Sequence, residues 1–399
     1  MTLTELALRR AGFTTLAAFQ RANALEPSDV LDVQTTARLL PYLLGYLQTE
    51  IRPGDSFYRF SQQYEVALPQ ILAANPGKDP DNLTIGEKVV IPLNFEVVPT
   101  DVSFDSELLG ACLRGLQARY PFLQVERIAT TDYGRGVNCV RIGSGTRVVS
   151  YNASHHANEW ITTPVLLHFL EEYAKAYVME QEIFGYPARQ LYESTTLYLV
   201  PMVNPDGVDL VTGAISPESF AYKQARNLAA NYPQIPFPDG WKANLNGVDL
   251  NLNYPAGWEQ ARQIKYEQGY DLPGPRDFVG LAPLDQPETA GMAALTQRIE
   301  PALTISYHTQ GGQIFWKFQD IEPEGAKALG ERFAEVSGYT LEEVPYASGF
   351  AGYKDWFLLV FNRPGYTIEA GLGQNPLPIS QFEQIYRDNL GILTLGLIG

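Results

Sequence analysis

Hydrophobic and polar positions change their spacing along the chain, and each change marks a different kind of segment. In residues 1–46 the apolar side chains recur at helical spacing, which predicts three short helices, in "TELALRRAGF", "TTLAAFQRANAL" and "DVQTTARLLPYLLGY", the last capped by Asp32. From about residue 97 onward, apolar runs such as "TRVVSYNAS" alternate with amphipathic stretches such as "TPVLLHFLEEYAKAY". This alternation predicts one large α/β domain with a mixed, mostly parallel sheet flanked by helices.

The segment between these two regions predicts a small βααβ module. A short strand leads to "RPGD", where Asp55 is expected to cap a helix that starts at Ser56. A second helix is expected to end at "NPG", and "TIGEKVVIP" then supplies a turn and a returning strand. The chain is therefore expected to divide into modules over residues 1–46, 47–96 and 97–399.

The composition is that of a folded globular protein, with 45% hydrophobic residues and a net charge of −16. This acidic balance makes nucleic acid and anionic membrane surfaces poor candidate partners. No apolar run reaches the length of about 18 residues that a membrane span needs, and the first residues lack the basic and apolar regions of a signal peptide. We expect a cytoplasmic protein with no membrane span; release to the cell wall or the spore by another route stays open. Cys112 and Cys139 are expected to be buried thiols, with a single bridge between them as the open alternative.

Two of the four histidines stand side by side in "SHHANEW", with a glutamate close behind. His156 and Glu159 are three residues apart, which places their side chains on one face in the first turn of a helix. A catalytic zinc usually has three protein ligands and a fourth position for water, so a third ligand must come from elsewhere. His308, at the end of the predicted strand "ALTISYH", could reach this pair. His168 lies inside a predicted helix and is expected to be structural or at the surface, and His155 receives no ligand role.

Glu369 ends another predicted strand, "PGYTIE", where a carboxylate could act as general base on metal-bound water. With the motifs "HHANEWIT", "NPDGVDLV", "NLNGVDLNLNYP", "SYHTQ", "GYKDWF" and "YTIEAG" in this order, the chain from about residue 97 resembles the zinc carboxypeptidase family, the carboxypeptidase A-like metallopeptidases. The resemblance implies one Zn²⁺ ion held by His156, Glu159 and His308, with Glu369 as the catalytic base.

The same resemblance implies roles for residues that meet the substrate. Lys242 matches the family's arginine that polarises the scissile carbonyl, and it keeps the positive charge without the two-pronged fork. Asn251 is implied to orient a substrate carboxylate. Asp355 matches the family's Asp-Trp segment, and Tyr346 falls near the substrate-binding tyrosine in a loop one residue longer than the family pattern. Leu252 replaces the arginine with which the family's exopeptidases clamp a terminal carboxylate, so selection for a free C-terminus should be weakened or lost.

Both N-terminal modules resemble domains that bind bacterial cell wall. The three-helix segment resembles small peptidoglycan-binding domains, although the glycine-rich loop of that family is shortened here to residues 26–32. The motifs "GD-S-FY", "LAANP" and "IGEKVVIP" of the second module resemble the lysin motif (LysM), which binds glycans that contain N-acetylglucosamine. Such modules would raise the local concentration of cleavable bonds around the catalytic domain.

A zinc carboxypeptidase-like domain that follows a LysM module resembles one branch of the family, the γ-D-glutamyl-L-diamino acid endopeptidases of spore-forming bacteria. The expected reaction is hydrolysis of the bond between γ-D-glutamate and the diamino acid, diaminopimelate or lysine, in peptidoglycan stem peptides. The implied partners are peptidoglycan and muropeptides, with the glycan on the LysM module and the stem peptide at the zinc site. Two alternatives stay open: a zinc carboxypeptidase that removes C-terminal residues, and a non-catalytic wall-binding protein with a decayed peptidase domain.

Overall fold

The three helices expected at the N-terminus are present in the computed structural model, which describes all residues from Met1 to Gly399. They are α1 (Leu3–Arg10), α2 (Leu16–Ala22) and α3 (Val33–Leu44). The side chains of Thr2, Thr15 and Asp32 each accept a hydrogen bond from the backbone N–H three residues on, which satisfies one free donor of each helix start. α3 ends at Gly45, whose φ of 76° is a left-handed conformation that glycine adopts without steric cost.

The βααβ order expected for the second module is confirmed. Its elements are β1 (Tyr46–Glu50), α4 (Phe57–Tyr64), α5 (Leu68–Ala74) and β2 (Lys88–Pro92), and the two strands pair antiparallel. The expected helix cap was wrong by one residue, because Ser56, and not Asp55, accepts from the N–H of Arg59. The Asp55 carboxylate instead accepts from the N–H of Arg52 and closes the preceding turn. A separate apolar core fills this module.

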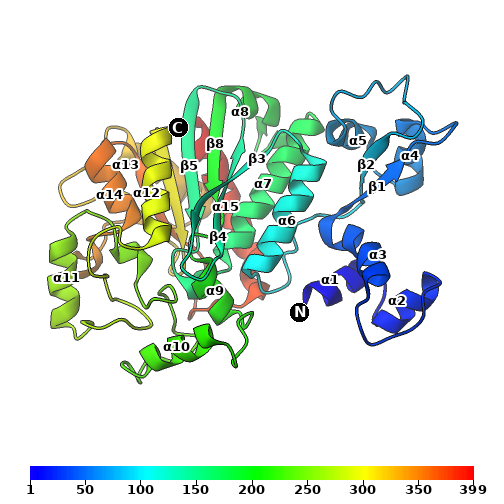
Figure 1. Cartoon of the computed structure of the whole chain (residues 1–399). Helices are drawn as coiled ribbons and strands as arrows, with labels where there is room; N and C mark the ends of the chain where they lie inside the picture. Colours follow the sequence, from blue (N-terminus) through cyan, green and yellow to red (C-terminus); the bar gives the residue numbers. More distant parts are fainter.

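An eight-stranded sheet forms the centre of the rest of the chain (Figure 1). Its strands lie in the order β11-β10-β12-β9-β5-β8-β4-β3. They are β3 (Gln124–Thr130), β4 (Gly136–Ile142), β5 (Arg147–Ala153), β8 (Thr195–Val200), β9 (Leu303–His308), β10 (Gln313–Phe315), β11 (Thr340–Glu342) and β12 (Gly365–Glu369). The central strands β8, β5, β9 and β12 run parallel, as expected, while β4 and β10 pair antiparallel with their central neighbours. The carboxyl ends of the central strands therefore meet at one edge, where such folds place their ligands.

Helices cover both faces of this sheet. The main helices are α6 (Ser106–Arg119), α7 (Thr162–Val178), α8 (Ala188–Ser194), α9 (Pro205–Val211), α10 (Phe220–Ala229), α11 (Trp258–Glu267), α12 (Pro287–Ile299), α13 (Ala326–Ser337), α14 (Tyr353–Phe361) and α15 (Phe382–Ile398). A short hairpin, β6 (Glu182–Ile183) and β7 (Tyr186–Pro187), and four 3-10 turns, η1 (Ala157–Glu159), η2 (Leu250–Leu252), η3 (Tyr346–Ser348) and η4 (Ile379–Gln381), complete the domain. The larger core lies between the sheet and α6, α7, α13 and α15, and a smaller core lies under α12 and α14. Strand β4 serves both: Val140 and Ile142 pack in the larger core, and Val137 and Cys139 in the smaller one.

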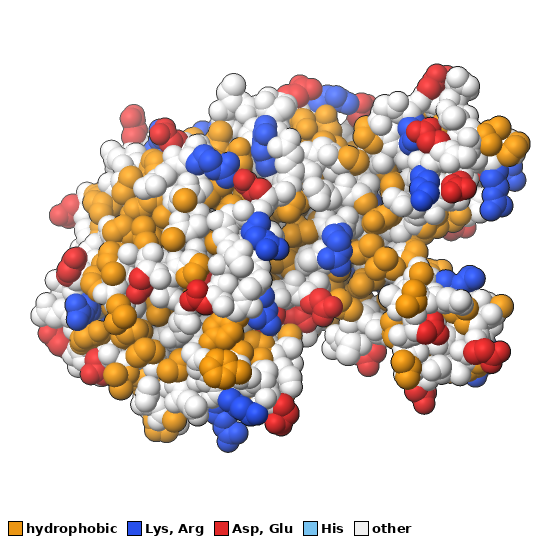
Figure 2. All heavy atoms as spheres, in the orientation of Figure 1, with side chains coloured by type: hydrophobic (Ala, Val, Ile, Leu, Met, Phe, Trp, Pro, Cys, Tyr) orange, Lys and Arg blue, Asp and Glu red, His pale blue; other side chains and the backbone are white.

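The two small modules are docked onto the large domain by a buried ion pair. Arg119 on α6 donates from Nε to the carbonyl of Gly45 at 2.8 Å, and its guanidinium lies 3.6 Å from the Glu171 carboxylate. Glu171 on α7 also accepts from the N–H groups of Val97 and Val98 at 2.7 and 2.8 Å. Because both charged side chains are buried, removal of either would leave an uncompensated charge. The pair ties the end of α3 and the start of the large domain together, and Figure 2 shows the modules as two lobes beside that domain.

Several expectations from composition can be compared with the structure. Cys112 and Cys139 are both buried and unbridged, which confirms the expected thiols, and burial raises the pKa of Cys139 to about 12. None of the helices has the length and apolar character to span a membrane. On the face drawn in Figure 2, Lys and Arg side chains are scattered among acidic ones, without a continuous basic patch of the kind that nucleic acid needs.

Candidate active site

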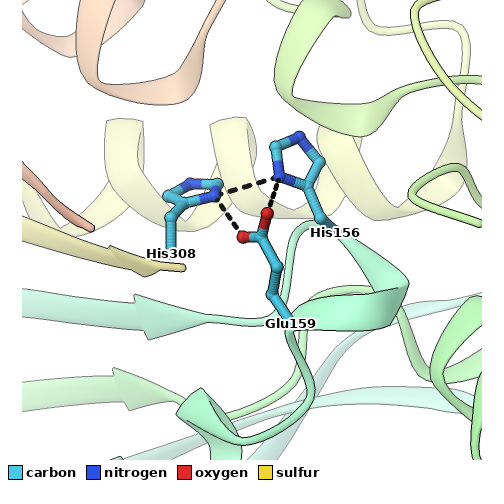
Figure 3. A group of neighbouring side chains, drawn as sticks. All are labelled: His156, Glu159 and His308. Carbon is cyan, nitrogen blue, oxygen red and sulfur yellow. Dashed lines mark hydrogen bonds and ion pairs between the residues drawn. The ribbon is translucent and has the colours of Figure 1, made fainter. Parts of the chain in front are cut away.

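His156, Glu159 and His308 come together beyond the carboxyl ends of the parallel strands (Figure 3). His156 directly precedes the short turn η1 that follows β5, and Glu159 is the last residue of that turn. His308 is the last residue of β9, which pairs in parallel with β5. The turn is a 3-10 turn and not the expected α-helical one, yet it brings Nδ1 of His156 within 2.9 Å of Oε1 of Glu159. Nδ1 of His308 lies 2.9 Å from Oε2 of Glu159 and 3.2 Å from Nδ1 of His156.

This donor set fits a zinc ion. Two imidazole nitrogens and a carboxylate oxygen lie within 4.8 Å of one another, which is the His₂Glu combination of catalytic zinc sites. Only one of the facing Nδ1 atoms of His156 and His308 can carry a proton between them, whereas a cation would engage both lone pairs. Nε2 of His156 lies 3.2 Å from Oδ1 of Asp249, the carboxylate support that metal-binding histidines usually have.

The electrostatics of the cluster favour a cation. Burial would raise the pKa of Glu159, but His156 and Lys242 hold it well below its ordinary value. Burial likewise lowers the pKa of His156, yet the carboxylates of Glu159 and Asp249 outweigh this effect and raise the pKa to about 9. Without a metal His156 therefore holds its proton more tightly than a free imidazole does, and a divalent ion would displace that proton as it binds.

Glu369 and Lys242 flank the cluster on either side. Glu369 ends β12 and stands opposite His308 in the parallel pairing of β12 with β9. Burial, and next the Glu159 carboxylate, raise the pKa of Glu369, which suits a general base that must hold a proton briefly. Nζ of Lys242 lies 3.0 Å from Oε1 of Glu159. Burial lowers the pKa of Lys242, but the carboxylates of Glu159, Glu369 and Asp249 together outweigh this effect, so the net shift is upward and the side chain stays a cation.

The cluster opens into a cavity of about 990 Å³, and only five of its 31 lining residues are hydrophobic, so it suits a polar ligand. Lys242, Asn251 and Asp355 line this cavity, as the sequence predicted. Tyr346 does not: it lies on η3 with 63% of its surface exposed and borders a smaller neighbouring cavity of about 340 Å³. Tyr346 therefore lies outside the cavity next to the metal cluster, and its role in binding substrate stays a prediction.

The other residues expected to meet the substrate differ in how many of their polar atoms are engaged by the protein. Oδ1 of Asn251 accepts from the N–H of Tyr353 at 3.0 Å, which leaves its amide NH₂ free to donate to a ligand. Asp355 is engaged by the protein, with Oδ1 lying 2.6 Å from Nζ of Lys354. Leu252 is only 8% exposed and packs in a small apolar cluster around Trp258. Leu252 thus serves packing at a position where the resemblance implied an arginine.

The other two histidines lie outside the cluster. His155 is fully buried, its Nε2 lies 3.1 Å from the hydroxyl of Tyr254, and its ring stacks on His308. Burial, and next His308, hold the pKa of His155 well below its ordinary value, so this imidazole is neutral. His168 lies on α7, where its ring packs edge-on against Tyr386 at 4.6 Å. His168 thus packs against its neighbours, in agreement with the expectation for this residue, and His155 lies beside the cluster without belonging to it.

Two supporting residues were not singled out from the sequence. Asp249, which contacts Nε2 of His156, stands inside the motif "GVDLN", so the motif itself could have identified it. Asn375 contacts Oε1 of Glu159 at 3.4 Å and donates to the carbonyl of Thr309 at 3.0 Å. Asn375 follows the last strand in an irregular segment, and no pattern in the sequence indicates its position.

Comparison with known families covers most of the catalytic part. Residues 109–391 match the model of the zinc carboxypeptidase family, peptidase M14. The chain belongs to the zinc carboxypeptidase family. It is accordingly a metallopeptidase whose cofactor is Zn²⁺, and His156, Glu159 and His308 are the residues that would hold the ion. Residues 50–92 match the LysM domain, in agreement with the βααβ module.

Individual relatives extend the match beyond the peptidase domain. The chain is 42% identical to gamma-D-glutamyl-L-diamino acid endopeptidase 1 of Lysinibacillus sphaericus, across 87% of this chain and 98% of that protein. It is 33% identical to the uncharacterized protein YqgT of Bacillus subtilis, across 84% of this chain and 89% of that protein. The crystal structure of carboxypeptidase A from Helicoverpa armigera superposes with a TM-score of 0.57 over 95% of this chain and 84% of that one, at 17% identity, and so shares the fold.

Proposed function

We propose that this zinc metallopeptidase hydrolyses the bond between γ-D-glutamate and the diamino acid in the stem peptides of peptidoglycan. The observation that carries the proposal is the 42% identity to an enzyme named for this bond, over 98% of that enzyme's length. The match spans 87% of this chain, which is more than residues 97–399 contribute, so it extends beyond the peptidase domain into the N-terminal part. This shared length supports the same class of substrate.

The side chains around the cluster divide the chemistry between them. Zinc, when held by His156, Glu159 and His308, supplies a Lewis acid and lowers the pKa of a water molecule. The Glu369 carboxylate accepts the proton of the attacking water and passes it to the leaving amine. The Lys242 ammonium stabilises the negative charge that develops on the scissile carbonyl oxygen.

The recognition side of the cavity supports an internal bond over a terminal one. A leucine at position 252 offers no donor, and its packing against Trp258 leaves it unable to hold a terminal carboxylate. The free NH₂ of Asn251 can still donate to a substrate carboxylate. A cavity of about 990 Å³ has room for groups on both sides of the cleaved bond.

The LysM module supports peptidoglycan as the substrate-bearing polymer. We infer that it binds the glycan strand while the catalytic domain cleaves the stem peptide. Docking through Arg119 and Glu171 holds the two activities at a set distance, which raises the local concentration of stem peptides. The proposal includes action on wall fragments recycled in the cytoplasm, or on cell wall reached by release during sporulation.

Digestion of defined muropeptides tests this function directly. Muropeptides with tri-, tetra- and pentapeptide stems would be incubated with the zinc-loaded protein and the products identified by mass spectrometry. We expect the same cut after γ-D-glutamate in every stem, because an endopeptidase does not count residues from the C-terminus. Release of only the last residue would indicate a carboxypeptidase, and no cleavage would indicate a wall-binding protein without activity.

A further inference from the structure

One basic side chain in the active-site cavity, that of Arg276, has hydrogen-bond donors that no protein group engages. The Lys and Arg side chains that line the cavity are Lys242, Lys265, Arg276 and Lys354. The three lysines each contact a protein acceptor within 3.0 Å through Nζ: Glu159 for Lys242, Asp277 for Lys265 and the carbonyl of Lys317 for Lys354. Arg276 is different, because only its Nε is engaged, by Oδ2 of Asp277 at 2.6 Å. Its two Nη atoms donate to no protein group, so they are available to a ligand.

Backbone hydrogen bonds fix the loop that carries Arg276 to the metal side of the cavity. The carbonyl of Pro275 accepts from the N–H of Lys242 at 2.7 Å. The N–H of Asp277 donates to Oδ2 of Asp249 at 3.2 Å, and the other oxygen of that carboxylate contacts the imidazole of the first metal ligand. These two backbone hydrogen bonds thus tie the loop of Arg276 to Lys242 and to the carboxylate that supports His156.

The neighbouring aspartate orients Arg276 without neutralising it. Asp277 has a φ of 66°, a conformation that is uncommon for a residue with a side chain and that here turns its carboxylate between two cations. Lys265 at 2.5 Å and Arg276 at 2.6 Å share this single carboxylate, so one positive charge is in excess. The Arg276 side chain is 41% exposed, which lets its fork reach a ligand in the cavity.

The proposed substrate carries the acceptors that such a fork binds. In the stem peptide the chain continues through the γ-carbonyl of D-glutamate, so the α-carboxylate of that residue stays free next to the scissile bond. The leaving diamino acid can carry free carboxylates of its own. An arginine fork binds a carboxylate through two parallel hydrogen bonds, and this geometry adds selectivity as well as affinity.

We propose that Arg276 binds a free carboxylate of the stem peptide adjacent to the cleaved bond, a task that Leu252 cannot perform. This inference rests on the proposed function and adds to it the residue that selects the substrate. An ordinary peptide linked through α-carbonyls lacks the first of these carboxylates. Arg276 therefore gives the enzyme a means to prefer γ-linked stems over such peptides.

The test pairs a variant with matched substrates. The tripeptide L-Ala-γ-D-Glu-diaminopimelate would be compared with versions in which each carboxyl group in turn is converted to an amide. We expect R276A to lower kcat/KM on the free peptide by roughly 10- to 100-fold, since a bond between charged partners is lost. Amidation of the carboxylate that Arg276 binds should lower the wild-type value by a similar factor and leave R276A unchanged. The amide to which R276A is insensitive identifies which carboxylate is bound.

Two controls keep the outcomes separate. Arg262 lies exposed on α11 outside the cavity, so R262A should keep the wild-type pattern with every peptide. R276A should fold, because Lys265 still pairs with Asp277, and R276K should retain part of the affinity. Equal losses for R276A on all peptides, or no loss on any, would overturn the role of Arg276.

Binding to the inactive E369Q protein separates this inference from the proposed reaction. Calorimetry would compare the affinity of the free peptide for E369Q and for the double variant E369Q/R276A, with an expected loss of roughly 10- to 100-fold. If the wild-type protein binds the peptide but cleaves none of the versions, the proposed reaction fails while the affinities still decide on Arg276. If E369Q does not bind the peptide at all, both proposals fail.

Discussion

The metal side and the recognition side of the cavity are built from different parts of the fold. On the metal side, His156, Glu159, His308 and Glu369 lie at strand ends or in the turn after a strand, and the first three contact one another within 3.2 Å. On the recognition side Asn251 and Leu252 lie on the 3-10 turn η2, and Arg276 lies in a loop and keeps its Nη atoms free of protein partners. The ends of the sheet strands thus position the metal cluster and Glu369, while the segments outside the sheet position the residues proposed to select the substrate.

This difference separates two kinds of experimental outcome. A change on the metal side should reduce turnover with every substrate, because it removes a group that acts on the scissile bond itself. A change on the recognition side should alter stability or the choice of substrate and leave the chemistry intact. The predictions below test this separation, starting with the largest effect.

Loss of the base should have the largest effect. We expect E369Q to lower kcat by roughly 10²- to 10⁴-fold, since the amide cannot accept the proton of water. Glu369 is not part of the metal cluster, so the zinc content measured by atomic absorption should stay at one ion per chain. H308A is the matched control and should lose both zinc and activity. Substantial turnover by E369Q would remove Glu369 from the mechanism.

Loss of the positive charge beside the cluster should come next. K242A is expected to lower kcat by roughly 10²- to 10³-fold, because the developing oxyanion loses a fixed donor. K242R should recover part of this loss, since it restores the charge. Steady-state kinetics on a soluble muropeptide would measure both variants. An increase in KM alone, with kcat unchanged, would assign Lys242 to substrate binding and blur the two sides of the cavity.

Leu252 tests whether a recognition-side residue can be purely structural. Truncation in L252A should lower the free energy of unfolding by about 2 to 4 kcal/mol, because the side chain packs against Trp258, Val279 and Ala351. Urea unfolding followed by tryptophan fluorescence would measure this change. The cleavage products should stay the same, and a new cleavage position would show that Leu252 contributes directly to selectivity.

The buried carboxyl group of Glu288 allows a test of the segment that carries Lys242 and Asn244. Its carboxylate lies 3.4 Å from Nδ2 of Asn244, two residues after Lys242, and burial raises the pKa of Glu288 to about 7. The folded protein therefore keeps this proton between about pH 4.5 and 7 while the unfolded chain releases it, so stability should fall as the pH rises through this window. The slope should reach at most about 1.4 kcal/mol per pH unit. Tm measured from pH 5 to 7 should fall less steeply for E288Q than for the wild-type protein; parallel curves would contradict the assignment.

The smallest effect is expected in the LysM module, far from the cavity. Tyr58 on α4 is 66% exposed, so its ring is free to contact a sugar ring. Y58A should reduce cleavage of insoluble peptidoglycan several-fold through loss of tethering, with no change on soluble muropeptides. An equal loss on both substrates would mean that the module affects the catalytic domain itself.

Much of the metal side could be predicted from the sequence. The spacing of His156 and Glu159 indicated that both could bind one metal ion, although the turn between them is 3-10 and not α-helical. His308 and Glu369 each end an apolar run, and parallel strands bring such ends to one edge. Local pattern and this topological rule indicated that the four side chains lie close together, and the resemblance to the zinc carboxypeptidases supplied their expected roles.

The recognition side could not be predicted in the same way. Tyr346 was expected near the substrate, but it lies on η3, is 63% exposed and borders a smaller neighbouring cavity. Arg276 lies in an irregular segment, and its position depends on the bond from the N–H of Asp277 to the carboxylate of Asp249. A residue in a loop carries no periodic signal that would reveal such a partner.

The sequence by itself predicted the βααβ and α/β elements, and its resemblance to the zinc carboxypeptidases implied the zinc ligands, the general base and the absence of an arginine at position 252. Only the tertiary structure decided that Leu252 fills an apolar cluster, that Asp249 supports His156, and that Arg276 presents free donors to the cavity. The physical reason is that hydrophobic periodicity encodes where strands and helices begin and end. The positions of loops, in contrast, depend on backbone hydrogen bonds between segments that are distant along the chain and share no common pattern.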